Sequence, residues 1–187
     1  MNNGKLFVIS GCSGVGKSSV LKLVMKARQD LQFSVSVTTR APRNNERDGV
    51  DYHFITREAF DGMVQRGELM EYDNHHSAGY GTERRQVLDK LSQGHVILDI
   101  DPAGAFQVRA ERPDVTLIFI TPPSLQELER RLRDRKDTTE EQIQIRMGRA
   151  PWEMEQSARY DYVVVNHQEQ QCADEILKII ADKVNEE

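Results

Sequence analysis

The sequence feature that most constrains the fold is a glycine-rich segment near the amino terminus. Residues 11–18 read Gly-Cys-Ser-Gly-Val-Gly-Lys-Ser, a complete G-x-x-x-x-G-K-S string. The segment follows the apolar run 6–9 and precedes apolar residues at helical spacing over 20–25. A strand end, a tight glycine turn and a helix start, in this order, are what a phosphate-binding P-loop requires. The segment therefore predicts binding of a nucleoside triphosphate.

Each residue type in this segment has a physical role in phosphate binding. The glycines let backbone N–H groups converge on phosphate oxygens, and the helix dipole adds positive potential. Lys17 would bring a full charge to the β- and γ-phosphates, and the Ser18 hydroxyl would bind Mg²⁺. The predicted ATP-binding residues here are Gly11, Cys12, Ser13, Gly14, Val15, Gly16, Lys17, Ser18 and Ser19.

Bulk properties exclude several classes of protein. A length of 187 residues fits one domain, or one core with modest insertions. The net charge of −5 argues against a protein that coats nucleic acid, and no apolar run is long enough to span a membrane. Two cysteines make no disulfide framework, and the N-terminal residues leave no room for a signal peptide. We expect a cytoplasmic protein that binds neither nucleic acid nor membrane.

Strand-like and helical patterns alternate along the chain, which is typical of a parallel sheet covered on both faces. We predict a P-loop α/β/α fold of three layers with a parallel five-stranded core sheet. Its strands are expected at 5–10, 34–38, 95–101, 115–120 and 161–165. Helices are expected at 17–29, 83–92, 103–110, 124–135, 139–156 and 169–184. Because the apolar runs are continuous, the strands should be buried on both faces.

Two segments interrupt the alternation. Residues 40–82 are polar and aromatic with short alternating runs, and they predict a small antiparallel insert with one helix near 57–66. Residues 130–157 are strongly charged and predict a helical hairpin that projects from the core. Two such appendages on a P-loop core favour a small kinase whose flaps close over two substrates.

Three clusters of charged residues have a possible chemical role besides a structural one. Arg40 and Arg43 flank Pro42, and a rigid turn would fix two guanidinium forks for a phosphate, although an exposed solvated loop explains them equally well. Glu71 could accept hydrogen bonds from guanine, although an ordinary strand-end glutamate is the simpler interpretation. Asp99 and Asp101 end a buried strand, where an unpaired charge is costly, so a Mg²⁺- or substrate-facing role is favoured.

A basic run begins the second appendage. Most of the cations over 130–136 are expected to be solvated. Arg135 and Arg146 flank the turn 137–139 and could instead reach a phosphate in transit.

These clusters, in this order, resemble the guanylate kinase family, from the P-loop to Asn166. The matching segments are Ser-Val-Ser-Val-Thr-Thr-Arg-x-Pro-Arg-x-x-Glu (34–46), Gly-x-Asp-Tyr-x-Phe (49–54), Leu-Met-Glu-Tyr (69–72), Tyr-Gly-Thr (80–82), Leu-Asp-Ile-Asp (98–101), Pro-Pro-Ser (122–124) and Tyr-Asp-Tyr-Val-Val-Val-Asn (160–166). The Thr-Thr-Arg-x-Pro-Arg element is rarely seen outside this family and its non-enzymatic relatives.

The resemblance implies three parts and a set of residue roles. The parts are a P-loop core (1–36, 90–129 and 158–187), a small mixed α+β GMP-binding insert (37–89) and a helical lid (130–157). By family pattern, the GMP-binding residues are Ser36, Arg40, Arg43, Glu46, Tyr52, Glu71, Tyr80, Thr82 and Asp101. The catalytic residues are Lys17, Arg40, Arg135 and Arg146, the metal-binding residues are Ser18 and Asp99 (directly or through water), and Asn166 lies near adenine.

The chain departs from the family pattern at several positions. Residues 77–79 read Ser-Ala-Gly where Gly-Asn-Tyr is usual, which loses an aromatic side chain beside the GMP site. Ala103 replaces a common glutamine, and His167 replaces the usual acid. Gly148 and Pro151 interrupt the expected lid helix, so we predict a kink near 147–151.

The resemblance implies Mg²⁺-dependent transfer of the γ-phosphoryl group of ATP to GMP or dGMP, in a monomer or homodimer. Two alternatives stay open. One is a catalytically silent relative that binds peptides through the GMP face, which the intact P-loop argues against. The other is a P-loop kinase on the same scaffold with another phosphorylated acceptor, which the altered 77–79 segment supports.

Overall fold

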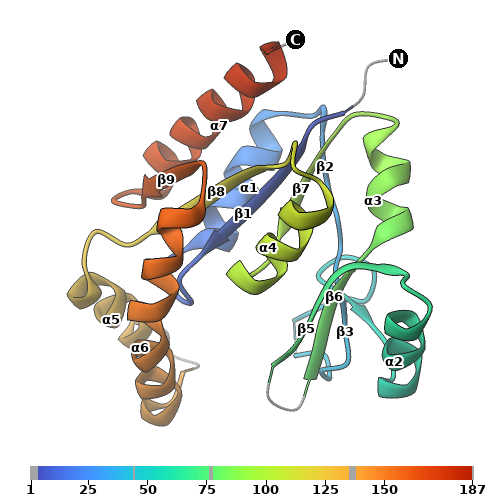
Figure 1. The fold of residues 1–187 in the computed structure, drawn as a ribbon. Coiled ribbons are helices and arrows are strands. Elements are labelled where there is room, and N and C mark those ends of the chain that lie inside the picture. Colours follow the sequence, from blue (N-terminus) through green and yellow to red (C-terminus); the bar gives the residue numbers. More distant parts are fainter. Residues whose placement is uncertain (1–3, 44, 76–77, 135–137, 187) are drawn as a thin grey trace. The chain divides into compact units, whose positions relative to one another are not determined.

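The computed structural model describes residues 4–43, 45–75, 78–134 and 138–186, and it has the predicted α/β character (Figure 1). One sheet has five strands in the order β2-β7-β1-β8-β9, and a second has four in the order β4-β3-β6-β5. The strands of the first sheet pair in parallel, β2 with β7, β1 with β8, and β8 with β9. The predicted parallel five-stranded sheet is confirmed.

The chain divides into two compact units, which we describe separately. The first unit comprises Met1–Leu6 and Asp30–Val115, and the second comprises Phe7–Gln29 and Thr116–Glu187. The predicted division into three parts (core, insert and lid) is a different division of the chain, and it stays a prediction.

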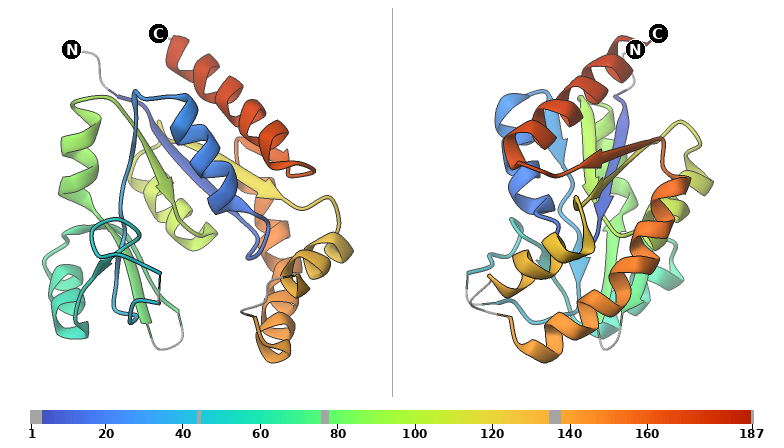
Figure 2. Two further views of the ribbon diagram at one scale, coloured as in Figure 1. Left: turned by 180° about the vertical axis from the view of Figure 1, so that it is seen from behind. Right: turned by 90° about the vertical axis from the view of Figure 1, so that its left-hand side faces the viewer.

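The second unit contains the P-loop. Its strands are β1 (Leu6–Gly11, whose first residue belongs to the other unit), β8 (Thr116–Thr121) and β9 (Tyr162–Val165). Its helices are α1 (Lys17–Ala27), α5 (Leu125–Arg133), α6 (Glu140–Glu155), the 3₁₀ turn η1 (Gln156–Arg159) and α7 (Glu169–Asn185). Helices α1 and α7 lie side by side, as do α5 and α6 (Figure 2). Strands β1 and β8 are buried along almost their whole length, as their continuous apolar runs predict. The same prediction is wrong for β9, an edge strand on which Val163 and Val165 are exposed.

The first unit contains the second sheet and its own small core. Its strands are β2 (Leu31–Phe33), β3 (Val37–Thr38), β4 (His53–Phe54), β5 (Leu69–His75), β6 (Ala78–Glu83) and β7 (His95–Asp99). Its helices are α2 (Arg57–Gln65), α3 (Arg84–Leu91) and α4 (Pro102–Glu111). Buried Val37, Phe60 and Leu69 form the core between α2 and the small sheet. Burying such side chains contributes about 2 kcal/mol each.

Two strand predictions in the first unit are wrong. Residues 34–38 are not a core strand, because the core strand is β2 at 31–33 and β3 belongs to the small sheet. At 34–38 the chain passes from one sheet to the other. Ser34 N–H still donates to the Ile97 carbonyl of β7 at 3.1 Å, Val35 N–H donates to Gln86 Oε1 at 3.0 Å, and the Ser36 carbonyl accepts from His53 N–H of β4 at 2.9 Å. The insert is also mixed and not purely antiparallel, because β3 pairs with β4 in parallel.

Helix α6 runs without a break through Gly148 and Pro151. Because Pro151 has no N–H, the Met147 carbonyl loses its helical partner. The Thr139 capping box and packing against α5 support the helix around that defect. A bend of the helix axis near 147–151 stays a prediction.

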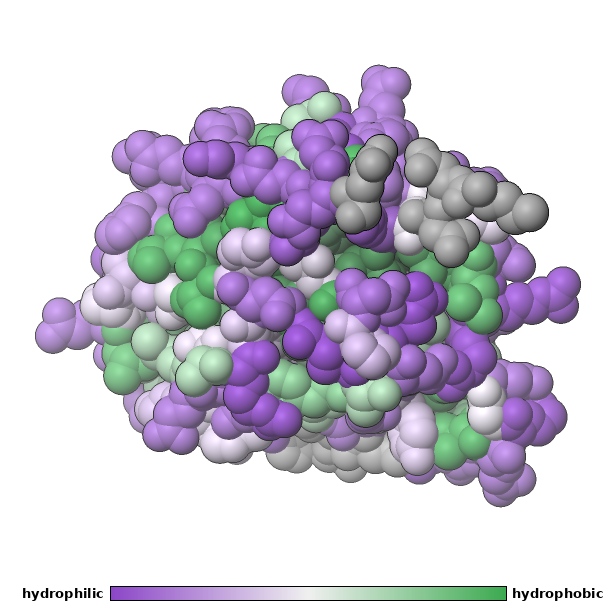
Figure 3. All heavy atoms as spheres, turned by 45° about the horizontal axis from the view of Figure 1, so that its top comes forward, coloured by the Kyte–Doolittle hydropathy of each residue, from purple (hydrophilic) through white to green (hydrophobic). Residues whose placement is uncertain are grey.

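Hydrophilic side chains cover much of the face shown in Figure 3. Among the described residues, no helix is long and apolar enough to cross a membrane.

Candidate functional site

The glycine turn between β1 and α1 depends on backbone conformations that favour glycine. Gly14 and Gly16 have φ angles of 95° and 94°, and Val15 N–H donates to the Cys12 carbonyl at 3.0 Å to close the turn. A Cβ atom on Gly14 would lie 2.5 Å from Leu132 Cδ2, so any other residue here would also displace the Leu132 side chain. The P-loop therefore has the tight turn that its sequence predicts.

The amino terminus of α1 carries no side-chain cap. Gly16 is its N-cap residue, and the Gly16 carbonyl accepts hydrogen bonds from Ser19 N–H at 3.1 Å and Val20 N–H at 3.2 Å. Lys17 is half-buried and Ser18 is exposed in the first turn. Such a terminus favours an anion, because its N–H groups and its dipole both present positive potential.

The side chains of Asn166 and Arg131 both donate hydrogen bonds to the P-loop backbone. The Asn166 amide Nδ2 donates to the Val15 carbonyl at 2.8 Å, and Arg131 Nη1 donates to the same carbonyl at 3.1 Å. Asn166 is 1% exposed, and its Oδ1 atom has no hydrogen-bond partner among the residues that the structure describes. A buried carbonyl oxygen without a donor is costly, so a ligand donor here would be favourable.

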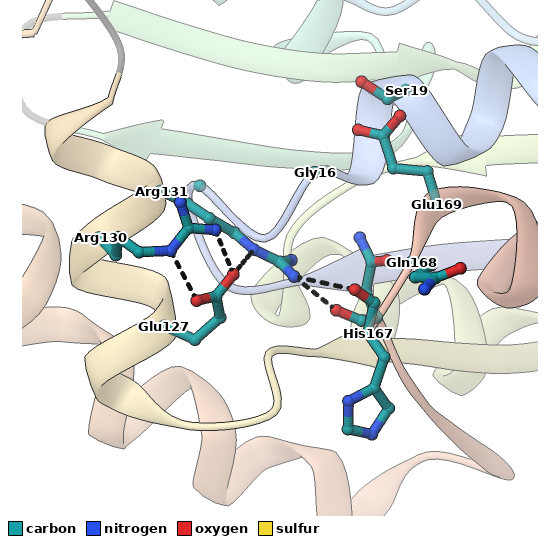
Figure 4. A pocket seen from close by; sticks show the side chains of 10 residues that line it. Gly16, Ser19, Glu127, Arg130, Arg131, His167, Gln168 and Glu169 are labelled. Atoms are coloured by element: carbon teal, nitrogen blue, oxygen red, sulfur yellow. Dashed lines mark hydrogen bonds and ion pairs between the residues drawn. The ribbon is translucent and has the colours of Figure 1, made fainter.

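A cavity of about 420 Å³ adjoins Asn166. It is lined by Gly14, Gly16, Ser19, Glu127, Arg130, Arg131, Asn166, His167, Gln168 and Glu169 (Figure 4). Glu127 accepts hydrogen bonds from Arg130 and Arg131, and these two guanidinium groups lower the pKa of the Glu127 carboxyl to about 2. Arg131 Nη2 also donates to the Asn166 carbonyl at 2.8 Å.

No motif in the sequence predicts this charged lining. The i, i+4 spacing of Glu127 and Arg131 indicates a helical ion pair, but it cannot show that the pair faces the P-loop. The prediction for Asn166 concerned its place near a base, and the structure puts its side chain against Val15 and in the cavity wall. Its role in binding stays a prediction.

Helix α6 reaches the P-loop at Ser13. Arg146 Nη1 donates to Ser13 Oγ at 3.2 Å, and Glu153 Oε2 accepts from Ser13 N–H at 3.1 Å. The sequence predicted a role for Arg146, whereas no motif indicated one for Glu153. Arg135, the other predicted lid arginine, lies outside the described residues.

In the first unit, Arg40 is fixed in one orientation. Its Nη1 and Nη2 atoms donate to the two Glu46 carboxylate oxygens at 2.9 Å each, and its Nε donates to the Tyr80 hydroxyl at 3.2 Å. The guanidinium lies 5.4 Å from the Tyr52 ring centroid. Hydrogen bonding to Arg40 lowers the pKa of Glu46. Glu46 also accepts from Arg43 N–H at 2.8 Å, so one carboxylate organises both arginine positions.

Four of the predicted acceptor residues thus lie together. Arg40 contacts Glu46, Tyr52 and Tyr80, and the Tyr52 and Tyr80 ring centroids lie 6.0 Å apart. Arg43 is connected to this cluster by the hydrogen bond from its backbone N–H to Glu46, and Arg43 is exposed. The cluster presents guanidinium and phenol donors, which suit a phosphate.

Glu71 is buried, with 4% exposure, on β5. Its Oε1 accepts a hydrogen bond from the Thr82 hydroxyl on β6 at 2.5 Å, which brings two predicted guanine-reading residues together. Burial raises the pKa of Glu71 to about 7, and the nearby Asp101 and Asp73 charges add to the effect while the Thr82 bond opposes it. A buried carboxylate beside a neutral hydroxyl is hard to explain as packing alone.

Helix α4 leaves room for the Glu71 carboxylate. Gly104 faces it, and a Cβ atom at that position would overlap Glu71 Oε2. Asp101, predicted to read guanine, is the N-cap of α4, and its Oδ1 accepts from Gly104 N–H at 2.9 Å. Capping gives Asp101 a structural role beside the predicted one. Ser36 lies just before β3, and Asp99 ends β7 half-buried.

The departure from the family pattern at 77–79 has a structural counterpart at Gly79. A Cβ atom on Gly79 would lie 2.7 Å from the Phe60 ring, so no side chain fits at position 79 with Phe60 in place. Gly79 N–H donates to Thr39 Oγ1 at 2.8 Å, and its carbonyl accepts from Thr39 N–H at 3.0 Å. Residue 77 lies outside the described residues.

The raised pKa of Glu71 predicts that the stability of the folded chain depends on pH. Between pH 4.5 and 7 the folded state binds more protons at Glu71 than the unfolded state does, so stability falls as pH rises through this range. Glu71→Gln removes the ionisation and keeps an acceptor for Thr82. We expect the stability of the variant relative to the wild type to rise by roughly 2–3 kcal/mol from pH 5 to pH 8, measured by urea unfolding. If the stability difference between the variant and the wild type is the same at both pH values, the raised pKa of Glu71 is contradicted.

Comparison with known proteins gives a family that covers nearly the whole chain. The guanylate kinase family model matches residues 3–185. The guanylate kinase of Synechococcus sp. (strain JA-3-3Ab) is 45% identical over 174 residues, which is 92% of this chain and 80% of that protein. The guanylate kinase of Fusobacterium nucleatum is 41% identical over 185 residues, covering 98% of this chain and 100% of that protein. The chain belongs to the guanylate kinase family.

A solved structure agrees with this family membership. The crystal structure of guanylate kinase from Anaplasma phagocytophilum matches with a TM-score of 0.81 and 32% sequence identity, over 99% of this chain and 88% of that one. The resemblance inferred from the motifs is therefore confirmed. A structure from Thermus thermophilus at 17% identity and a TM-score of 0.60 shares the fold.

Proposed function

We propose that this chain transfers the γ-phosphoryl group of ATP to a phosphate oxygen of GMP or dGMP, giving ADP and GDP or dGDP. Membership of the guanylate kinase family with a complete P-loop carries the proposal. The buried Glu71–Thr82 pair supports guanine as the acceptor base. An ionised carboxylate can accept from guanine N1–H and the 2-amino group, whereas adenine has a donor at neither position and would leave it unpaired.

The transfer requires charge neutralisation more than proton abstraction. The acceptor phosphate has a second pKa near 6, as other phosphate monoesters do, so it is largely dianionic at neutral pH and needs no general base. One of its oxygens bonds to the γ-phosphorus as the bond to the β–γ bridging oxygen breaks. Lys17 on the donor side and Arg40 and Arg43 on the acceptor side would offset the repulsion between the two anions. Arg135 and Arg146 would act on the phosphoryl group in transit.

The oxygen donors suit the magnesium ion that the family uses. Ser18 has an exposed hydroxyl in the first turn of α1, and Asp99 is a half-buried carboxylate at the end of β7. Mg²⁺ prefers hydroxyl and carboxylate oxygens together with phosphate and water, so these residues fit it. When bound with ATP, Mg²⁺ would neutralise charge on the β- and γ-phosphates.

The donor base is proposed to occupy the cavity beside Asn166. The unpartnered Asn166 Oδ1 would accept a hydrogen bond from the 6-amino group of adenine. Arg130 and Arg131 offer flat guanidinium groups in the same wall.

A coupled assay of ADP release tests the function. With Mg²⁺ and ATP present, we expect turnover with GMP and dGMP to exceed that with AMP, UMP and ribose phosphates by about 10³-fold or more in kcat/KM. Higher activity with another acceptor would support the alternative kinase suggested by the 77–79 segment. No activity with any acceptor would support the other alternative, a catalytically silent family member that binds peptides.

A further inference from the structure

Two side chains of α6 hold a single residue of the P-loop. Glu153 accepts from the Ser13 backbone N–H at 3.1 Å, and Arg146 donates to the Ser13 hydroxyl at 3.2 Å. The two are seven positions apart, which is two helical turns, so they project from one face of α6. The contacts span 140 and 133 positions of the sequence, so only the folded chain brings them together.

The Glu153 contact is suited to fixing the loop. A carboxylate that accepts from a backbone N–H makes a charge-assisted bond, roughly twice as strong as a neutral one. Burial first, and then the Glu153 charge, raise the pKa of the neighbouring Cys12 thiol to about 12. Ser13 lies directly before Gly14, whose positive φ gives the loop its sharp turn.

Arg146 needs such an anchor. An arginine side chain carries about 2 kcal/mol of rotamer entropy, and a guanidinium that must meet a phosphoryl group in transit acts best when it is held in place beforehand. Arg146 Nη1 donates to a neutral hydroxyl of the loop, so this contact depends on the position of α6 relative to the loop.

We propose that Glu153 is a positioning residue, which docks α6 on the Ser13 backbone so that Arg146 is held at the phosphate end of the P-loop. The inference rests on the proposed function, because Arg146 acts on the phosphoryl group only in that reaction. Glu153 itself does not contact the substrate. Its carboxylate keeps its bond to Ser13 while ATP is bound.

Steady-state kinetics of the full chain with MgATP and GMP test the proposal. We expect Glu153→Ala to lower kcat about tenfold, with the KM for GMP unchanged. Glu153→Gln should recover kcat to within about threefold of the wild type, because its amide oxygen can still accept from Ser13 N–H. Glu155→Ala is the matched control: it removes an exposed carboxylate from the same helix and should leave kcat unchanged.

A double-mutant cycle separates positioning from a merely structural role. If Glu153 acts through Arg146, Glu153→Ala should cost less than about twofold in kcat when Arg146 is already alanine. Fully additive losses would overturn the proposal, as would an unchanged kcat in the single variant. Tighter MgATP binding by Glu153→Ala in calorimetry would also overturn it, since Glu153 would then compete with phosphate.

The same experiments distinguish failure of this inference from failure of the function. A wild type that turns over GMP beside a fully active Glu153→Ala overturns the inference alone. A wild type that transfers no phosphoryl group overturns both. If Glu153→Ala unfolds, the cycle is run with Glu153→Asp, whose shorter side chain should lose the Ser13 contact and lower kcat.

Discussion

Replacing Lys17 with methionine is expected to lower kcat/KM with MgATP and GMP by at least about 10³-fold. Methionine keeps a side chain of similar length at the half-buried position and removes only the charge. The loss should fall mainly on kcat, because the charge that spreads over the phosphoryl group in the transition state is what Lys17 offsets. Steady-state kinetics from the coupled ADP assay measure it.

Lys22→Met is the matched control for this experiment. Lys22 is exposed on the same helix, and replacing it with methionine changes the net charge by the same amount as Lys17→Met does. It should retain activity within about twofold of the wild type, as is usual for surface substitutions. Turnover by Lys17→Met near the wild-type level would remove the role proposed for the P-loop.

Replacing Glu71 with glutamine is expected to reduce acceptor selectivity. The amide can accept only one of the two guanine donors, and it places its own N–H₂ group against the other. Losing a hydrogen bond to a charged group should lower kcat/KM for GMP by about 10²-fold, with little effect on the KM for ATP. The ratio of GMP to AMP activity should fall by the same factor or more.

Two controls make this result specific. Glu68→Gln neutralises a partly exposed carboxylate three positions away, which pairs with Arg66, and it should leave selectivity unchanged. Urea unfolding of Glu71→Gln at the assay pH shows whether a loss of activity reflects unfolding, because its stability relative to the wild type should rise from pH 5 to pH 8. Unchanged selectivity in a folded Glu71→Gln variant would show that other groups read the base.

The sequence predicted most helices and the core sheet because their signals are local. The helices begin within one residue of the predicted positions where a cap is encoded, as at Ser124 and Thr139. The strand prediction at 34–38 was wrong because the chain leaves β7 after Ser34 and joins the small sheet at β3. No local pattern shows where a strand passes from one sheet to another.

The site residues divide in a similar way. The P-loop could be found because its chemistry requires a contiguous string of glycine, lysine and serine. Glu153 and Gly104 could not, because each acts through a partner far along the chain, Ser13 and Glu71 respectively. Asp101 was found as a charged residue at a strand end, but its use as a helix cap depends on where α4 begins.

By itself, the sequence determined that this protein has a phosphate-binding turn between a buried strand and a helix, and it determined the family to which the chain belongs. Only the tertiary structure decided which carboxylates are buried, which are paired with arginine and which hold the backbone of another element. The reason is physical: spacing along the chain fixes the face on which a side chain lies, whereas its desolvation and its partners depend on what packs against that face.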